Sequence, residues 1–454
     1  MQNINGVIKI NNANDFILPN VKCSVGIPSA SAVQKDTSQI KIHSKKNDPN
    51  SAPEDSAPKP VKVTLSDCMS CTGCVTSSEE LFQAQDINEF KKGLESEAQF
   101  KVVTLSPQSI SSIAVKRGLS PQVVAAAIAS YLKSIGIHYV LDSSFARELT
   151  QQRIYDDFVR PDRTGPLITG VCPGVVAFAE KNEPKTLMPQ LSVTRSPMLI
   201  SGALVKDYLA QSLGTVPSAI FHACVMPCFD KKLEAFRADA KLADGTQLVD
   251  CVVTSAEFES FIPADLTPYI IQPTTVTPFD WTSALEHAYL QGSSGDSTSG
   301  SYAEYIVSRM ERDLPNAIVE RKKIYEGVEF HITQAGADLD KRIVILNGYR
   351  NFQRVVNQLK TGKTKYDFVE LMACPGGCAN GAGQVRSDKP HENKKILDEV
   401  TAAYRTIAPD EIIRDSFAHV LNQWSEVNPN YEKLIYAKYE AARVNELIEA
   451  ANAW

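Results

Sequence analysis

The chain lacks any long apolar run. No stretch approaches the ~18 consecutive apolar residues that a membrane-spanning helix requires, so we expect no membrane association. Residues 1–20 contain no basic region followed by an apolar core, a pattern that does not fit a secretory signal peptide. These absences favour the cytosol, with the nucleus as a second compartment.

The sequence also lacks a strong excess of either charge. Its 47 Lys and Arg residues and 53 Asp and Glu residues give a net charge of −6 without a large basic block, so nucleic acid is not an expected partner. No G-x-G-x-x-G motif opens a helix after a strand, which argues against dinucleotide binding. Residues 361–364, Thr-Gly-Lys-Thr, resemble the end of a phosphate-binding loop, but Asn357 occupies the position of the required earlier glycine.

What the chain does have is ample material for a core and an unusual set of cysteines. Its 454 residues exceed one ordinary core, and 43% hydrophobic with 22% charged residues describe a soluble globular protein. Cytosolic thiols are kept reduced, so the ten cysteines are better explained as metal ligands than as disulfides.

Composition divides the chain into four regions. A cysteine-bearing N-terminal region contains an insert rich in Ser, Pro, Lys and Asp, which we expect to be disordered. A second disordered loop is expected where the sequence reads Gly-Ser-Ser-Gly-Asp-Ser-Thr-Ser-Gly. The predicted regions are 1–100 with the insert at 24–60, a first α/β lobe at 101–265, a second α/β lobe at 266–393 with the loop at 291–301, and a C-terminal helical segment and tail at 394–454.

Strands and helices alternate through the two predicted lobes. Ser120-Pro121 predicts a helix start, and the helix runs from Val123 to Lys133 before Gly136. Apolar strands separated by helices favour parallel α/β sheets. Predicted strands are 137–141, 167–171, 219–225, 248–253, 342–346 and 368–373; predicted helices are 352–359 and much of 394 to the end, including an amphipathic stretch at 431–451.

Four cysteines lie in three loops that each follow a predicted strand. Cys374 and Cys378 belong to a glycine-rich loop, Cys172 precedes Pro-Gly, and Cys228 follows Met-Pro. Glycines let a backbone approach a bulky inorganic group and offer it amide donors. Ligands bind at the carboxyl ends of strands in open α/β sheets, and four thiolates are what one iron–sulfur cluster requires.

A second cysteine group lies near the N-terminus. Cys68, Cys71 and Cys74 have C-x2-C-x2-C spacing, which lets one loop hold three corners of a cubane. The position of the next ferredoxin cysteine is Ser78, so the fourth ligand comes from elsewhere, and Cys23 is the natural candidate. Zinc is the alternative, although zinc sites usually pair two C-x2-C knuckles or a knuckle with histidines.

The three loops with Cys172, Cys228 and Cys374 resemble the cluster-binding signatures of the iron-only hydrogenase family, most closely its eukaryotic branch of cytosolic iron–sulfur assembly factors. The resemblance implies an α/β fold in which two lobes with parallel sheets enclose a cluster, plus a small N-terminal cluster region and a C-terminal helical segment. It also implies two [4Fe–4S] clusters, whose ligands would be Cys23, Cys68, Cys71 and Cys74, and Cys172, Cys228, Cys374 and Cys378.

For this branch, the resemblance implies a non-catalytic carrier that links an upstream scaffold to a targeting complex with a β-propeller subunit. True hydrogenases have a proton-relay cysteine before the first ligand, where this chain has Val171, and valine cannot transfer a proton. We therefore expect no catalytic residues. A degenerate redox enzyme of the hydrogenase type is the alternative.

Three charged residues also match the hydrogenase motifs: Lys231, Glu234 and Glu370. A buried Lys231 ammonium would offset the negative charge of a cluster, although an ordinary surface lysine is the simpler interpretation. Glu370 is expected to pair with that lysine or to cap the glycine loop. The remaining thiols in apolar runs, Cys224 and Cys251, are expected in the core.

The final Trp454 fits a short terminal motif with which proteins of this pathway dock on the targeting complex, although Ala453 departs from the motif. An aromatic anchor beside a free carboxylate is a plausible binding element. The alternative is that Trp454 packs on the terminal helix.

Overall fold

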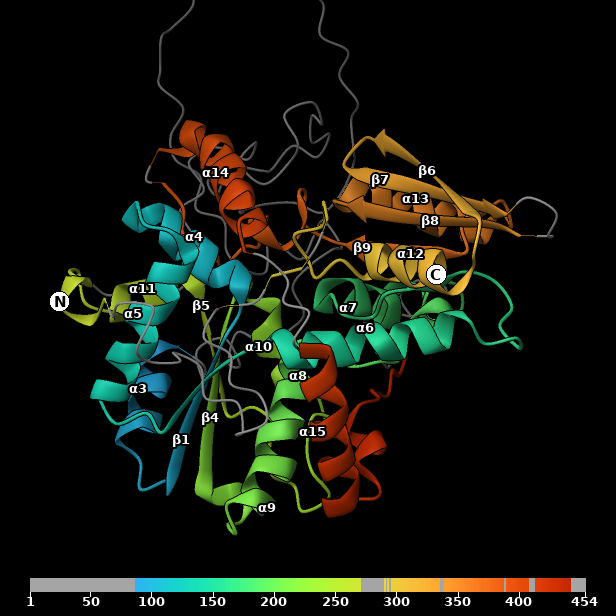
Figure 1. Cartoon of the computed structure of the whole chain (residues 1–454). Coiled ribbons are helices and arrows are strands. Elements are labelled where there is room, and N and C mark those ends of the chain that lie inside the picture. The colour runs from blue at the N-terminus through green and yellow to red at the C-terminus, as the bar shows by residue number, and fades with distance from the viewer. Residues whose placement is uncertain are drawn as a thin grey trace, which may run out of the picture. The chain divides into compact units, whose positions relative to one another are not determined.

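Two β-sheets form the framework of the described part of the chain (Figure 1). The computed structural model describes residues 86–270, 290, 292–293, 295–334, 339–387, 389–407 and 413–441, all within the unit formed by residues 73–454. The α/β class expected from the sequence is confirmed. The insert predicted at 24–60 lies outside the described residues.

The first sheet is entirely parallel, with the strand order β2-β1-β4-β5. Its central strands are apolar on both faces, as parallel strands covered by helices require. Three of its strands fall where the sequence predicts strands, whereas β1 was not predicted. The strands are β1 (Phe100–Leu105), β2 (Tyr139–Asp142), β4 (Ile220–Met226) and β5 (Cys251–Thr254).

The second sheet is mixed, with the order β3-β9-β8-β7-β6. It is parallel across β3, β9 and β8, but β6 and β7 form an antiparallel hairpin that also pairs antiparallel with β8. In β7 every second residue is buried, a pattern typical of antiparallel strands with one solvated face. The expectation of parallel sheets is therefore wrong for this hairpin. The strands are β3 (Leu167–Ile168), β6 (Ala317–Ile324), β7 (Gly327–Gln334), β8 (Asp340–Asn347) and β9 (Phe368–Met372).

The strand predicted at 167–171 belongs to the second sheet, not to the first lobe at 101–265. After β2, the helix α6 (Ser144–Phe158) carries the chain across, and β3 then pairs with β9. The lobe boundary drawn from sequence order is wrong here, because strand pairing does not follow chain order.

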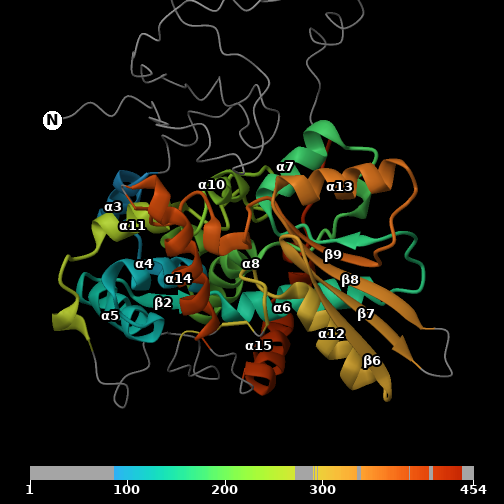
Figure 2. The same ribbon diagram turned by 90° about the horizontal axis from the view of Figure 1, so that it is seen from above.

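Helices cover both faces of each sheet. In the second sheet, α6 and α12 pack on one face and α7 and α13 on the other (Figure 2). In the first sheet, α4, α5 and α11 cover one face and α8 and α10 the other. The helices besides α6 are α3 (Ile87–Glu95), α4 (Pro107–Arg117), α5 (Pro121–Ser134), α7 (Pro173–Asn182), α8 (Pro197–Ala203), α9 (Ala210–Ser212), α10 (Asp230–Ala235), α11 (Ser255–Phe261), α12 (Tyr302–Asp313), α13 (Tyr349–Lys360), α14 (Asn393–Arg405) and α15 (Ile413–Val427).

Local signals explain several helix ends. The Ser120 hydroxyl accepts the Val123 amide and Pro121 takes the first helical position, so the predicted start of α5 is confirmed. Shorter turns are η3 (Met188–Gln190), η5 (Pro217–Ala219), η6 (Thr267–Tyr269), η7 (Gly377–Asn380), η8 (Pro390–Glu392) and η9 (Tyr431–Leu434), with one π-helical turn, η4 (Leu204–Leu209).

The amphipathic helix predicted at 431–451 is wrong for residues 431–441. Only η9 is helical there, and the chain then runs extended beside residues 193–195. The Ala437 amide donates to the Val193 carbonyl at 2.7 Å, and Ile435 is fully buried. The apolar side chains thus pack as an extended segment.

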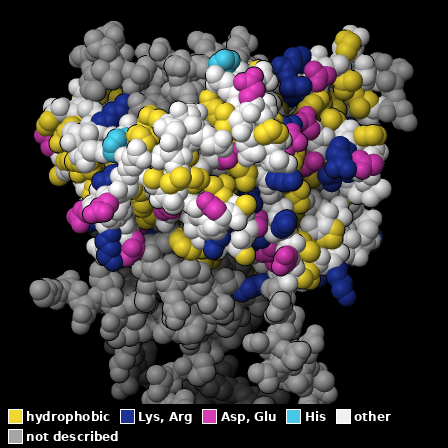
Figure 3. Space-filling model, turned by 90° about the horizontal axis from the view of Figure 1, so that it is seen from below, with side chains coloured by type: hydrophobic (Ala, Val, Ile, Leu, Met, Phe, Trp, Pro, Cys, Tyr) yellow, Lys and Arg dark blue, Asp and Glu magenta, His cyan; other side chains and the backbone are white. Residues whose placement is uncertain are grey.

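Charge and apolarity of the described residues agree with the composition. The face in Figure 3 carries basic and acidic side chains interspersed rather than segregated by sign. None of the helices in the described ranges combines the length and apolarity needed to cross a membrane.

Candidate metal centre

The four cysteines predicted as ligands lie at the carboxyl ends of strands in both sheets. Cys172 follows β3 and precedes the first residue of α7. Cys228 follows β4, Cys374 follows β9, and Cys378 lies in η7. This is the edge at which parallel sheets bind ligands.

The three loops contact one another through their glycines. A Cβ added at Gly174 would lie 3.4 Å from the Ala373 Cβ, so the first and third loops pack side by side. The Gly383 amide donates to the Pro227 carbonyl at 2.9 Å, and a Cβ added at Gly383 would lie only 2.7 Å from the Thr254 side chain. The third loop therefore contacts both others, which brings the cysteines toward a common centre.

Burial makes these thiols poor acids on their own. It raises the pKa of Cys172 and raises that of Cys228 well above its ordinary value, and it brings the pKa of Cys378 to about 11. Negative charge on Cys374 and Cys378 adds to the effect on Cys228, and charge on Cys172 adds to that on Cys378. Thiols that disfavour each other's ionisation need a cation between them to become thiolates, as a metal centre provides.

Single-ion geometry differs from this arrangement. Within the described ranges, no three His, Cys, Asp or Glu side chains converge closely enough to hold one metal ion. The donor set itself consists of four sulfurs from three loops, which is the chemistry of an iron–sulfur site.

Lys231 is a buried ammonium beside this centre. Its Nζ donates to the Val171 carbonyl at 3.1 Å and pairs with Glu234 at 2.5 Å, and its side chain is 12% exposed. Burial alone would lower the pKa of Lys231, but charge on Glu234, Cys228 and Cys378 raises the pKa above its ordinary value. A positive charge is therefore held next to the thiols.

Residues 295–301, here called the serine strap, are buried. Ser297, Thr298 and Ser299 are 3%, 4% and 7% exposed. The disordered loop predicted at 291–301 is therefore wrong for residues 292, 293 and 295–301. The reason is that the strap's hydroxyls and backbone find partners from distant parts of the chain, among them Gln108, Gln151 and Glu370.

Glu370 anchors this strap instead of pairing with Lys231 or capping the glycine loop. The Ser297 hydroxyl and the Ala303 amide donate to its carboxylate, the amide at 2.9 Å. Burial raises the pKa of Glu370 to about 7. Nothing in the sequence linked Glu370 to the strap, since small polar residues look alike in ordered and disordered segments.

The other described cysteines behave as predicted. Cys224 and Cys251 are 0% and 2% exposed within the first sheet, and all six described cysteines are free thiols. His222 contacts the Thr104 hydroxyl at 2.8 Å, and burial lowers the His222 pKa to about 3, so it is a neutral core residue.

The N-terminal set, Cys23, Cys68, Cys71 and Cys74, and the terminal Trp454 lie outside the described residues. Their roles stay predictions.

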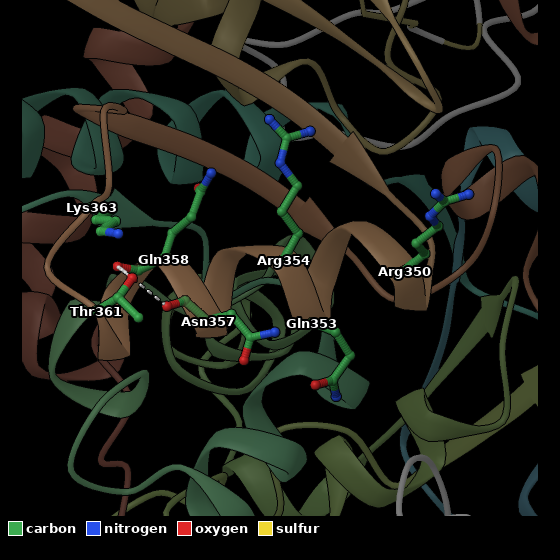
Figure 4. A pocket seen from close by; sticks show the side chains of 7 residues that line it. All are labelled: Arg350, Gln353, Arg354, Asn357, Gln358, Thr361 and Lys363. Atoms are coloured by element: carbon green, nitrogen blue, oxygen red, sulfur yellow. Dashed lines mark hydrogen bonds between the residues drawn. The ribbon is translucent and has the colours of Figure 1, made fainter.

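A shallow hollow of about 570 Å³ runs along the outer side of α13, with Arg350, Arg354 and Lys363 among its lining residues (Figure 4). It contains the phosphate-loop-like residues 361–363, which directly follow α13. A phosphate-binding loop instead joins a strand to a helix. The hollow is lined without any of the cysteines.

Known proteins resemble this chain over most of its length. Residues 99–382 match the family "Iron only hydrogenase large subunit, C-terminal domain". The chain is 39% identical over 459 residues to "Probable cytosolic Fe-S cluster assembly factor" of Brugia malayi, covering 99% of this chain and 98% of that protein. It is 32% identical over 435 residues to "Cytosolic iron-sulfur assembly component 3" of Bos taurus, covering 89% and 90%. A solved structure of the [FeFe]-hydrogenase HydA1 from Chlamydomonas reinhardtii aligns with a TM-score of 0.64 at 22% identity, over 78% of this chain and 99% of that chain, a likeness of fold alone.

Proposed function

Because this chain belongs to the family of cytosolic iron–sulfur cluster assembly factors that contain the iron-only hydrogenase domain, we propose that it carries iron–sulfur clusters in cytosolic and nuclear protein assembly. It would link an upstream scaffold to the late targeting complex. The single observation that carries this proposal is the meeting of four buried thiols from three loops beside the Lys231 ammonium.

The C-terminal cluster would be held by Cys172, Cys228, Cys374 and Cys378. When bound, a [4Fe–4S] cluster supplies iron and sulfide as cargo and a one-electron couple. The chain's own residues supply sulfur ligands, an amide-rich glycine loop, and the Lys231 charge that offsets the anionic centre.

The N-terminal cluster would be held by Cys23, Cys68, Cys71 and Cys74. Its support is the C-x2-C-x2-C spacing and the relatives' alignment over nearly the whole chain. Trp454 is proposed as an anchor for the targeting complex, whose β-propeller subunit and associated factors would be the partners.

The proposed role needs no catalysis. Val171 is 5% exposed and offers only its carbonyl to Lys231, so its side chain provides no proton route to the centre. A hydrogenase-type redox enzyme is the second candidate, favoured by the shared fold and by the ammonium beside Cys378. Hydrogen evolution from the anaerobically purified protein with a reduced dye would support that candidate.

The test is iron and acid-labile sulfide content with EPR spectra, measured anaerobically on the full chain. We expect about eight irons in the wild type and about four after Cys68, Cys71 and Cys74 are changed together to alanine, because two four-iron cubanes are independent. Cys228→Ala should also remove about four irons. The matched control is Cys224→Ala, a core thiol that should leave iron content unchanged. Zinc in place of iron would contradict the proposal.

A further inference from the structure

The serine strap is hydrogen-bonded to the backbone of the cysteine loop, defined here as residues 374–383. The Ser299 Oγ accepts the Cys378 amide at 3.0 Å. The Thr298 Oγ1 accepts the Ala379 amide at 3.3 Å and donates to the Gly376 carbonyl at 2.9 Å. The strap therefore lies directly on the loop that bears two of the four thiols.

Gly377 permits this close approach. Its φ is +76°, and a Cβ added there would lie 2.7 Å from both the Ser299 Oγ and the Thr298 Oγ1. Only glycine combines that conformation with that contact.

The strap is held in place from behind. The Ser297 hydroxyl donates to Glu370, Gln108 Nε2 donates to the Thr298 carbonyl at 3.1 Å, and Gln151 Nε2 donates to the Gly300 carbonyl at 2.6 Å. Since these partners belong to β9, α4 and α6, the Ser299 hydroxyl is positioned by the folded domain and not by the loop alone.

The Ser299 hydroxyl still has its proton to donate. A serine hydroxyl has one donor and two acceptor sites, and the Cys378 amide uses an acceptor site. The same hydroxyl lies within hydrogen-bonding reach of the Cys378 side chain, where its hydrogen bond favours the thiolate. Hydrogen bonds to the sulfurs are among the factors that set the reduction potential of an iron–sulfur cluster.

We propose that Ser299 is a positioning residue whose O–H donates to the Cys378 Sγ and raises the reduction potential of the C-terminal cluster. The inference rests on the proposed function, because it assumes a cluster at Cys378. A donor to sulfur favours the more negative, reduced cluster, so its removal should disfavour reduction. Thr298 makes no such bond in this account and acts on the loop backbone alone.

The test is an EPR-monitored redox titration of the full chain carrying alanine at Cys68, Cys71 and Cys74, so that only the C-terminal cluster contributes. We expect Ser299→Ala to lower the equilibrium constant for one-electron reduction about tenfold, equivalent to ~59 mV. Thr298→Val and Ser301→Ala are the controls and should change this constant less than about twofold, because neither hydroxyl donates to sulfur. Thr298→Val should instead speed iron loss to a chelator.

An unchanged potential in Ser299→Ala would overturn the inference, and so would an equal shift in Thr298→Val, which would mark a structural effect of the strap. If Ser299→Ala fails to retain iron, Ser299→Thr carries the test, since it keeps the hydroxyl and should keep the wild-type potential; a tenfold shift there would overturn the inference. Absence of a four-iron signal in the parent protein would instead contradict the proposed function.

Discussion

The cysteine loop and the serine strap lie against each other but are held in opposite ways. The loop depends on its own backbone, with Gly376 and Gly377 at φ values of +74° and +76°. The strap depends on hydrogen bonds to side chains far away in the sequence, including Gln108 and Gln151. One segment presents ligands and the other fixes their orientation, so the centre is built from two unequal halves.

The largest effect should come from the half that presents ligands. Cys374→Ala removes one sulfur from the proposed cluster site, and three thiols with an open corner would not retain a stable cubane. We expect loss of about four irons per chain, measured by iron analysis after anaerobic purification. Cys251→Ala, a buried thiol in β5, is the control and should retain the full content. Retention of iron by Cys374→Ala would break the comparison.

Gly377→Ala should disturb both halves at once. The added Cβ meets two buried hydroxyls at 2.7 Å in a left-handed backbone conformation, so we expect a loss of about 2–4 kcal/mol in the free energy of unfolding. Gly362→Ala is the matched control, because Gly362 has a φ of +63° but nothing within 4 Å of an added Cβ.

Denaturant unfolding of the two alanine variants separates contact from strain. The Gly362 variant should lose only the backbone cost of about 1–2 kcal/mol. Equal losses in the two variants would mean that the strap does not press on the loop.

The anchor of the strap should make stability depend on pH. Burial raises the pKa of Glu370 from 4.5 to about 7, so between these values the folded state keeps a proton that the unfolded state has lost. Stability should therefore fall as pH rises from about 4.5 to about 7, by ~3 kcal/mol at most, and level off above. Glu370→Gln should flatten this part of the profile, measured by unfolding at several pH values. Parallel profiles for the two proteins would exclude Glu370 as the source.

The smallest effect is expected just before the strap. The Ser293 hydroxyl contacts the Tyr404 hydroxyl at 2.7 Å and accepts from the Ser301 hydroxyl at 3.1 Å. Ser293→Ala should cost about 1 kcal/mol in unfolding free energy and leave iron content unchanged. Loss of iron in this variant would show that the whole strap, and not only its contact with the loop, controls the centre.

Much of the fold could be predicted from the sequence because its signals are local. Ser120-Pro121 starts α5, and apolar runs mark β4, β8 and β9. The placement of β3 beside β9 and the antiparallel hairpin depend on which strands pair, and this is decided by contacts between distant residues. The extended course of residues 435–441 has the same origin, since packing overrides a helical pattern.

The candidate site divides along the same line. Cys172, Cys228, Cys374 and Cys378 were identified because thiols in glycine-rich loops have a chemistry of their own. Ser299 was missed because serine occurs equally in flexible linkers, and its role arises only from burial against Cys378. Glu370 was assigned to the surroundings of the centre, but its partners Ser297 and Ala303 could not be deduced from spacing.

The most direct measurement is native mass spectrometry of the full chain with alanine at Cys68, Cys71 and Cys74, compared with the same protein carrying Cys374→Ala. The account predicts an added mass of four irons and four sulfides on the first protein and none on the second. An unloaded first protein, a single zinc, or an equal load on both proteins would contradict a cluster held by Cys172, Cys228, Cys374 and Cys378.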